Sequence, residues 1–394
     1  MTIMKWMVNE RLAYLCPSSL ALLLLLGASA VAQEAPKEPN WTEMLKKGLA
    51  GKESLDRRAA QQWLDTQVQQ LLTGEDPKTV QALGSSLYTK LTGHYQSKDA
   101  SREFRTGLAE IVAESFTRQY KPSADSAKPP HPLGAAMVLM MLRDFKQPSC
   151  LPGFKAALAD PTPGPRLVAA EGIAGIREQL NDQEWAALVA ELQKTAVKET
   201  SSVTLSRIYR ALMVETANRA DAVIPVLNGI LDSRLASYEK ELKRPAEADG
   251  ELVAWLARRV EKMNNPAVRT GTLSRAARLL ADSVDALAND PSDGEWQEPL
   301  ERLIITVEPA VESLAKTIAS NPNTALPKPS IRDALTTGGK ARRKLMTDAL
   351  GALIGTTGKP GALNQNPFNL PVGLDIQRTP RPATTSAPAS GPAK

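Results

Sequence analysis

The chain has 394 residues, of which 42% are apolar, 23% charged and only 4% aromatic, and its formal net charge is +5. This length and apolar content allow one extended domain or two compact domains with a buried core. Two histidines and two cysteines argue against a histidine-rich metal site, a zinc knuckle or a disulfide framework. We therefore expect no metal and no cofactor.

The first 32 residues have the three parts of a secretory signal. A mildly basic start with Lys5 and Arg11 precedes the apolar run 20–26, and small residues follow up to Ala32. We predict cleavage after Ala32 and hence a secreted or periplasmic protein. An uncleaved N-terminal anchor is the alternative, although the apolar run is shorter than the eighteen or so residues that a transmembrane helix needs.

Charge is unevenly distributed along the rest of the chain. Residues 325–394 contain ten basic and three acidic side chains, a net charge of +7, whereas residues 33–324 have a net charge of −3. The pI of 9.1 therefore describes the C-terminal end of the chain and not its body.

Residues 33–120 are predicted to form an N-terminal helical region. Apolar side chains recur there at steps of three and four, which places them on one buried face of each helix. Two such stripes are Val80, Leu83, Leu87 and Leu91, and Phe104, Leu108, Ile111, Val112 and Phe116. Asp76-Pro77 pairs a capping residue with a proline and so predicts a helix end or start.

The proline-rich stretch 121–132 is interpreted as a linker or long loop that divides this region from the helices that follow. Residues 133–324 continue the helical period, with breaks at Asp160-Pro161, Asn265-Pro266, Asp290-Pro291 and Asn321-Pro322. The alternation of apolar and polar residues that would predict strands is close to absent. The predicted fold class is all-α.

Four prolines lie at nearly constant steps of about 74 residues along the helical region. They are Pro77, Pro152, Pro225 and Pro299. This spacing predicts a repeat of about 74 residues, or two subunits of about 37, each of them a helical hairpin.

Residues 150–179 resemble a HEAT-type repeat. Their first helix ends at Asp160-Pro161, and an alanine-rich second helix begins near Arg166. Asn265-Pro266, followed by Arg269, repeats this turn. The resemblance, which covers about thirty residues, implies an α-solenoid of stacked antiparallel helical hairpins whose curved surface binds other macromolecules. The physics agrees, because a single helix pair cannot bury its apolar face alone.

Residues 325–354 are predicted to be a basic helical segment. Lys340, Arg342, Arg343 and Lys344 open a short helix whose other side is apolar. We predict that these four residues contact an anionic partner, either a polymer or a membrane surface. A solvated basic face without a partner is the alternative. No aromatic residues are interleaved with these charges, so no nucleic-acid partner is expected.

The glycine- and proline-rich composition of residues 355–394 predicts a disordered tail. Elsewhere, motifs that carry chemistry are scarce. His94 and His131 are isolated and are expected to be solvated or capping residues. Carboxylate pairs such as Glu308 and Glu312 are expected on solvated faces. Cys150 is expected either to be a small buried residue or to form an intermolecular disulfide.

The sequence therefore predicts a secreted or periplasmic helical-repeat scaffold that mediates protein–protein interaction and has no catalysis of its own. One alternative is a helical-toroid enzyme acting on an extracellular polymer, which would need acids, histidine or tyrosine converging in a cleft. Another is an envelope structural protein tethered through its basic C-terminal end, which salt would release.

Overall fold

The computed structural model describes residues 36–47, 55–122, 129–241, 245–289, 297–321, 326–337, 339–356 and 358–375. The predicted secretory signal and residues 376–394 of the predicted tail lie outside this part of the chain. Regular structure in the described ranges is helical, apart from one isolated bridge between Thr356 and Lys359. The all-α prediction is confirmed.

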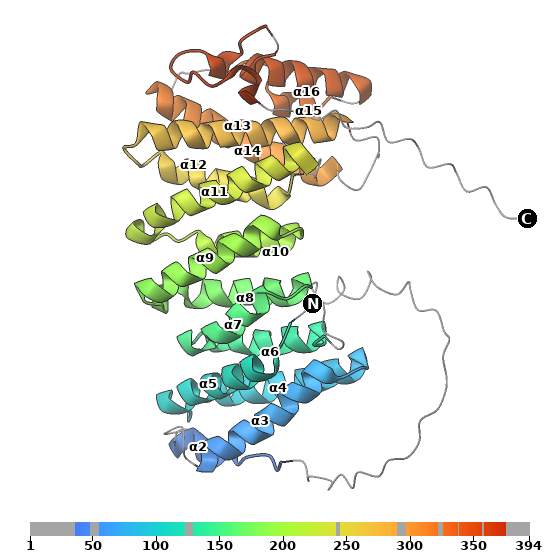
Figure 1. Ribbon diagram of the computed structural model, residues 1–394, viewed down its shortest axis with the longest axis vertical. Helices are drawn as coiled ribbons and strands as arrows, with labels where there is room; N and C mark the ends of the chain where they lie inside the picture. Colours follow the sequence, from blue (N-terminus) through green and yellow to red (C-terminus); the bar gives the residue numbers. More distant parts are fainter. Residues whose placement is uncertain are drawn as a thin grey trace, which may run out of the picture. The chain divides into compact units, whose positions relative to one another are not determined.

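Helices α3 to α14 alternate between two layers (Figure 1). In the odd layer, consecutive members pack against each other: α3 (Leu55–Thr73), α5 (Arg102–Gln119), α7 (Leu151–Leu158), α9 (Asp182–Lys198), α11 (Ala217–Glu241) and α13 (Pro266–Asn289). The even layer does the same with α4 (Pro77–Gln96), α6 (Pro132–Phe145), α8 (Pro163–Ile176), α10 (Ser202–Leu212), α12 (Glu247–Val260) and α14 (Gln297–Ala319). Each helix thus packs mostly against near neighbours in chain order.

The predicted apolar stripes form the core between the layers. All five residues of the α5 stripe are fully buried, and Val80, Leu87 and Leu91 on α4 are at most 3% exposed. On α14 the buried stripe is Leu300, Leu303, Ile304, Val307, Val311 and Leu314. Burying one such side chain contributes roughly 1.5–3 kcal/mol. These stripes join one hydrophobic cluster that reaches from Trp41 to Leu374.

Polar caps set the helix starts that the sequence indicates. The Asp76 carboxylate accepts hydrogen bonds from the backbone N–H groups of Lys78 and Thr79, at 3.3 and 3.0 Å. With the Thr79 hydroxyl, these donors hold the pKa of Asp76 below its ordinary value. Asn181 caps α9 in the same way, and Glu184 completes its capping box.

The stretch interpreted as a linker instead joins two helices of one packed unit. Helix α6 begins at Pro132 and contacts α3, α4 and α5, so the helices on either side of residues 121–132 share one core. The His131 backbone N–H donates to the Leu72 carbonyl at 2.8 Å. Residues 123–128 lie outside the described ranges. The proposed division at this point is therefore replaced by continuous packing.

His131 also caps α6, and this predicts an acid-sensitive helix start. Its unprotonated Nδ1 accepts from the Gly134 backbone N–H at 3.4 Å. Burial lowers the pKa of His131 and also that of His94. The unfolded chain therefore binds protons first as the pH falls below about 6.5, and stability is lost as the pH continues down through the folded-state pKa values.

We expect the melting temperature to fall between pH 7 and pH 5, a window above the ordinary pKa values of the carboxylates. His131→Asn keeps a capping acceptor but does not titrate. This variant should lose part of the pH dependence while keeping its melting temperature at pH 7. Equal slopes for the two proteins, measured by thermal unfolding followed by circular dichroism, would contradict the assignment.

The repeat register predicted from the four prolines is wrong. Pro77 begins α4 in the even layer, whereas Pro152 lies near the start of α7 in the odd layer. Pro225 lies inside α11, and Pro299 lies in the first turn of α14. Equivalent helices therefore do not begin at equivalent prolines. The repeated feature is the alternation of the two layers, which helices of different length satisfy equally well.

The C-terminal part of the described chain closes one end of the packing. Helix α15 (Ile331–Leu335) packs on α14, and α16 (Gly339–Ile354) packs on α13. Two 3-10 turns, η3 (Ala362–Asn364) and η4 (Val372–Asp375), then lie against α16. This segment buries Leu363, Phe368, Leu370 and Leu374. Residues 358–375 therefore differ from the expectation of disorder from residue 355, because these four apolar side chains reach the core, although Val372 is 45% exposed.

Candidate binding groove

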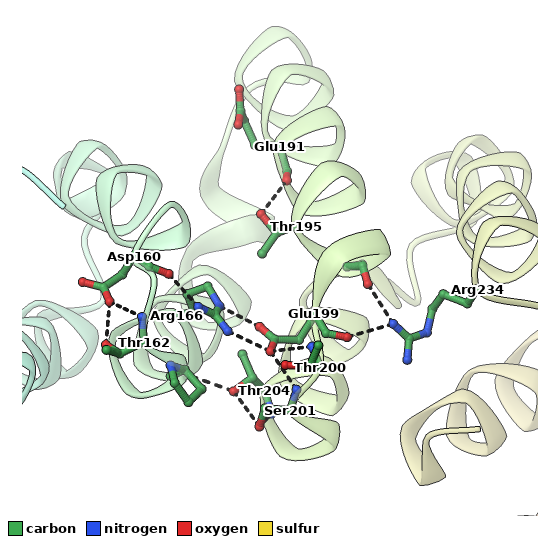
Figure 2. Close-up of polar contacts among 12 residues, drawn as sticks. Asp160, Thr162, Arg166, Glu191, Thr195, Glu199, Thr200, Ser201, Thr204 and Arg234 are labelled. Atoms are coloured by element: carbon green, nitrogen blue, oxygen red, sulfur yellow. Dashed lines mark hydrogen bonds and ion pairs between the residues drawn. The ribbon is translucent and has the colours of Figure 1, made fainter. Parts of the chain in front are cut away.

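Arginines join one helical hairpin to the next. Figure 2 shows Arg166 on α8 facing Glu199 at the end of α9, with guanidinium-to-carboxylate distances of 2.7 and 2.8 Å. Arg166 also donates to the Asp160 carbonyl at 2.6 Å. Glu199 is 4% exposed and accepts from the backbone N–H groups of Thr200 and Ser201 as well. The turn that carries the HEAT-type resemblance thus holds two hairpins together.

Arg234 on α11 extends this junction to the following hairpin. Its Nη1 donates to the carbonyls of Ala196 and Glu199 at 3.1 and 3.0 Å, and its Nε donates to Asp249 on α12 at 2.9 Å. Asp249 is fully buried and also accepts from the hydroxyl of Tyr209 at 2.5 Å. These charged groups are saturated with protein partners, so they serve packing.

A pocket of about 430 Å³ beside this junction is not a strong ligand site. Two of its three acidic lining residues, Asp160 and Glu199, are already occupied by protein donors, and the third is Glu191. Its lysines include Lys155 and Lys198, which lie in the last turns of α7 and α9. A lysine at that position offsets the negative end of the helix dipole, which accounts for its presence without a ligand.

A larger groove, of about 590 Å³, runs over the even layer from α8 to α14. Its apolar floor consists of Ala174, Met213, Ala254 and Trp255. Trp255 is 7% exposed, and its indole Nε1 donates to Glu215 at 3.3 Å, which fixes the ring. Such a floor can receive an apolar side chain from a ligand.

The charged wall of the groove contains Arg177, Arg210, Arg258 and Glu251. Arg210 and Glu251 lie 3.8 Å apart, beyond hydrogen-bond distance, and their side chains are 56% and 42% exposed. Glu251 instead accepts from the Ser206 hydroxyl at 2.8 Å. Arg258 is exposed and has no ion pair with any described residue. Part of the positive charge of this wall is therefore left unmatched.

The basic cluster predicted on α16 is only partly exposed. Arg342 turns back to pair with Glu301 on α14, and its side chain is 16% exposed. Burial raises the pKa of Glu301, but hydrogen bonds from Arg342 and Gln297 bring it below its ordinary value. Arg343 has a partner of its own, and Lys344 is exposed. The side chain of Lys340 lies outside the described part of the chain. Contact of this cluster with an anion stays a prediction.

The remaining sequence candidates occupy structural positions. The His94 ring stacks on Trp41 with the ring centroids 5.8 Å apart. Glu308 is 4% exposed rather than solvated, because it accepts from the backbone N–H groups of Ile331 and Arg332 at the start of α15. Cys150 is a buried free thiol, and burial raises its pKa to about 12. A thiol in that state is a poor partner for disulfide exchange.

Among the residues that the structure describes, no three of His, Cys, Asp and Glu come together as metal ligands. Over the same ranges, no helix combines the length and the apolar character that crossing a membrane requires. No family model matches the chain, and no curated protein or solved structure is significantly similar to it. The function is therefore inferred from the geometry of this chain alone.

Proposed function

We propose that this protein is a secreted or periplasmic binding and scaffold protein, built as a HEAT-like α-solenoid, that engages a protein partner through the groove on its even layer. It has no catalytic activity of its own in this proposal. The observation that carries the proposal is the groove itself, in which an apolar floor lies beside arginines on consecutive helices, of which Arg258 has no ion pair with any described residue.

Neighbour-only packing supports the solenoid. Consecutive helices in each layer contact one another, from α3 to α13 and from α4 to α14. Stacking of this kind buries the apolar face of every hairpin while leaving the outer faces of its helices free for ligands.

The composition of the groove supports a protein ligand. Tryptophan, arginine and methionine are enriched at protein interfaces, and the first two are the residues that most often dominate binding energy. Arg210 on α10, Met213 directly after the end of α10, and Trp255 on α12 come together here.

The packing of two glutamates, Glu239 and Glu308, supports a role without catalysis. Glu239 pairs with Arg278, and Glu308 accepts hydrogen bonds from Arg332 and the start of α15. Both carboxylates are occupied by protein donors and do not converge in the groove.

Photocrosslinking in the cells of origin tests the groove. A photoactivatable residue at position 254 replaces Ala254 in the groove, and a matched one replaces Val197, which is 38% exposed on α9 in the odd layer. We expect one defined adduct from position 254 only, lost when Trp255→Ala removes the floor. Equal adducts from both positions, or none from position 254, would contradict the proposal.

The compartment is tested on the same recovered protein. Residues 1–32 support export, and the predicted mature chain begins at Gln33. Sequencing of its N-terminus should therefore read from Gln33. A chain that still begins at Met1 in the cytoplasmic fraction would remove export from the proposal and leave the groove to be judged by its adduct.

A further inference from the structure

We infer that the groove selects an extended acidic peptide segment with an apolar side chain, and that Glu251 weakens this binding by competing for Arg210. The inference rests on the proposed function and names the chemistry of its partner. It is argued from three features of the groove: its charge, its floor and its direction across the helices.

Charge decides the sign of the partner. Three arginines and one glutamate line the groove, so its net charge is positive. Arg258 has no ion pair within the described ranges, Arg210 forms only a long ion pair of 3.8 Å with Glu251, and Arg177 pairs with Glu178 at 3.5 Å. Guanidinium groups bind carboxylates in a planar, two-pronged geometry that adds both energy and orientation. Peptide carboxylates are therefore the groups that this wall fits.

The apolar floor of the groove indicates that the peptide has an apolar side chain between its carboxylates. Trp255 is 7% exposed and is bordered by the small residue Ala254 and the flexible Met213, so the floor is apolar and adaptable. At the far side, Thr306 lines the groove, and the adjacent Ile305 is 51% exposed. An apolar side chain placed here leaves water, while acidic groups on either side reach the arginines.

The direction of the groove decides the form of the segment. It crosses α8, α10, α12 and α14, which are consecutive members of one layer. Packed helices lie about 8–10 Å apart, so this path is about 25–30 Å long. An extended peptide covers that length with about eight or nine residues. A short extended segment can therefore contact every helix of the groove.

Glu251 is the one carboxylate on the wall and sets a limit on affinity. Its partner Ser206 holds it at 2.8 Å, facing the space that Arg210 also faces. An incoming carboxylate meets repulsion from Glu251 and competes with it for Arg210. Glu251→Gln removes the charge and keeps an oxygen that accepts from Ser206, so the fold should be unaffected.

Titration of the purified full chain with synthetic peptides tests this inference. The probe is a peptide of about nine residues with alternating glutamate and leucine, and the comparison peptide has glutamine at each glutamate. We expect the acidic peptide to bind at least about tenfold more tightly than the neutral one. Glu251→Gln should tighten its binding about threefold to tenfold, and Arg258→Gln should weaken it about tenfold.

Lys194→Gln, an exposed change on α9 away from the groove, is the matched control and should leave affinity unchanged. A gain of affinity in Glu251→Gln cannot arise from misfolding, which separates this result from a structural effect. Equal binding of the two peptides, no binding of either, or no gain in Glu251→Gln would overturn the inference. A crosslinked partner at position 254 that lacks an acidic segment would overturn it while leaving the proposed function in place.

Discussion

Arg234→Met lowers the free energy of unfolding by about 3–5 kcal/mol, because it leaves a buried carboxylate without its counter-charge. Asp249 is fully buried, so water cannot compensate for the lost guanidinium. Arg234 is itself only 6% exposed. Arg234 also donates to the carbonyls of Ala196 and Glu199 at the end of α9. Methionine fills much of the same space but supplies none of these donors.

Urea unfolding at pH 7 measures this loss, and two variants make it interpretable. Arg302→Met breaks a surface ion pair with Glu247, in which the arginine side chain is 48% exposed. This variant should change the free energy of unfolding by less than about 1 kcal/mol. The double variant Arg234→Met with Asp249→Leu removes both buried charges and should recover part of the loss. A cost for Arg234→Met no larger than that for Arg302→Met would show that the buried pair contributes little.

Gly134→Ala is expected to lower the free energy of unfolding by about 1–3 kcal/mol, at the crossing of α3 and α6. A Cβ atom added at Gly134 would lie 1.9 Å from the carbonyl oxygen of Leu71, which belongs to the backbone of α3. No side-chain rotation can relieve that overlap, so one helix must move. The shift also displaces the cap that His131 provides.

Gly93→Ala in α4 is the matched control for this change. A Cβ atom at Gly93 meets nothing within 4 Å, so the substitution adds only helix propensity. It should stabilise the protein by up to about 1 kcal/mol. The two alanine variants thus have effects of opposite sign in the same urea titration. Stabilisation by both variants would mean that the backbone of α3 at Leu71 does not lie close enough to Gly134 to clash with an added Cβ atom.

The helices were predictable because their signal is local. The stripe from Phe104 to Phe116 has the helical period, and every member is buried. Residues 358–375 have no such period. Their packing combines four buried apolar side chains with Asn364, whose amide donates to the carbonyls of Leu370 and Pro371 at 3.0 and 2.8 Å. Irregularly spaced contacts of this kind leave no repeated pattern in the sequence.

The groove could not be predicted because its residues meet only through the packing of the layers. Arg177, Arg210 and Arg258 lie near the ends of α8, α10 and α12, far apart in the chain. Their shared position becomes visible only when the order of helices in the even layer is known. The basic cluster on α16 is the opposite case. Its residues are adjacent in the sequence and were therefore predicted to act together, yet Arg342 pairs with Glu301 on α14.

Packing between neighbours alone gives the even layer the compliance of a spring. The distance from α8 to α14 depends on the interfaces of α8 with α10, α10 with α12, and α12 with α14, and on the packing of α12 and α14 against α13 in the odd layer. A small slide at each interface adds to the others, so the span of the layer changes by more than any one interface moves. Small displacements at consecutive interfaces of the even layer therefore add along its length, while the contacts of α12 and α14 with α13 limit them.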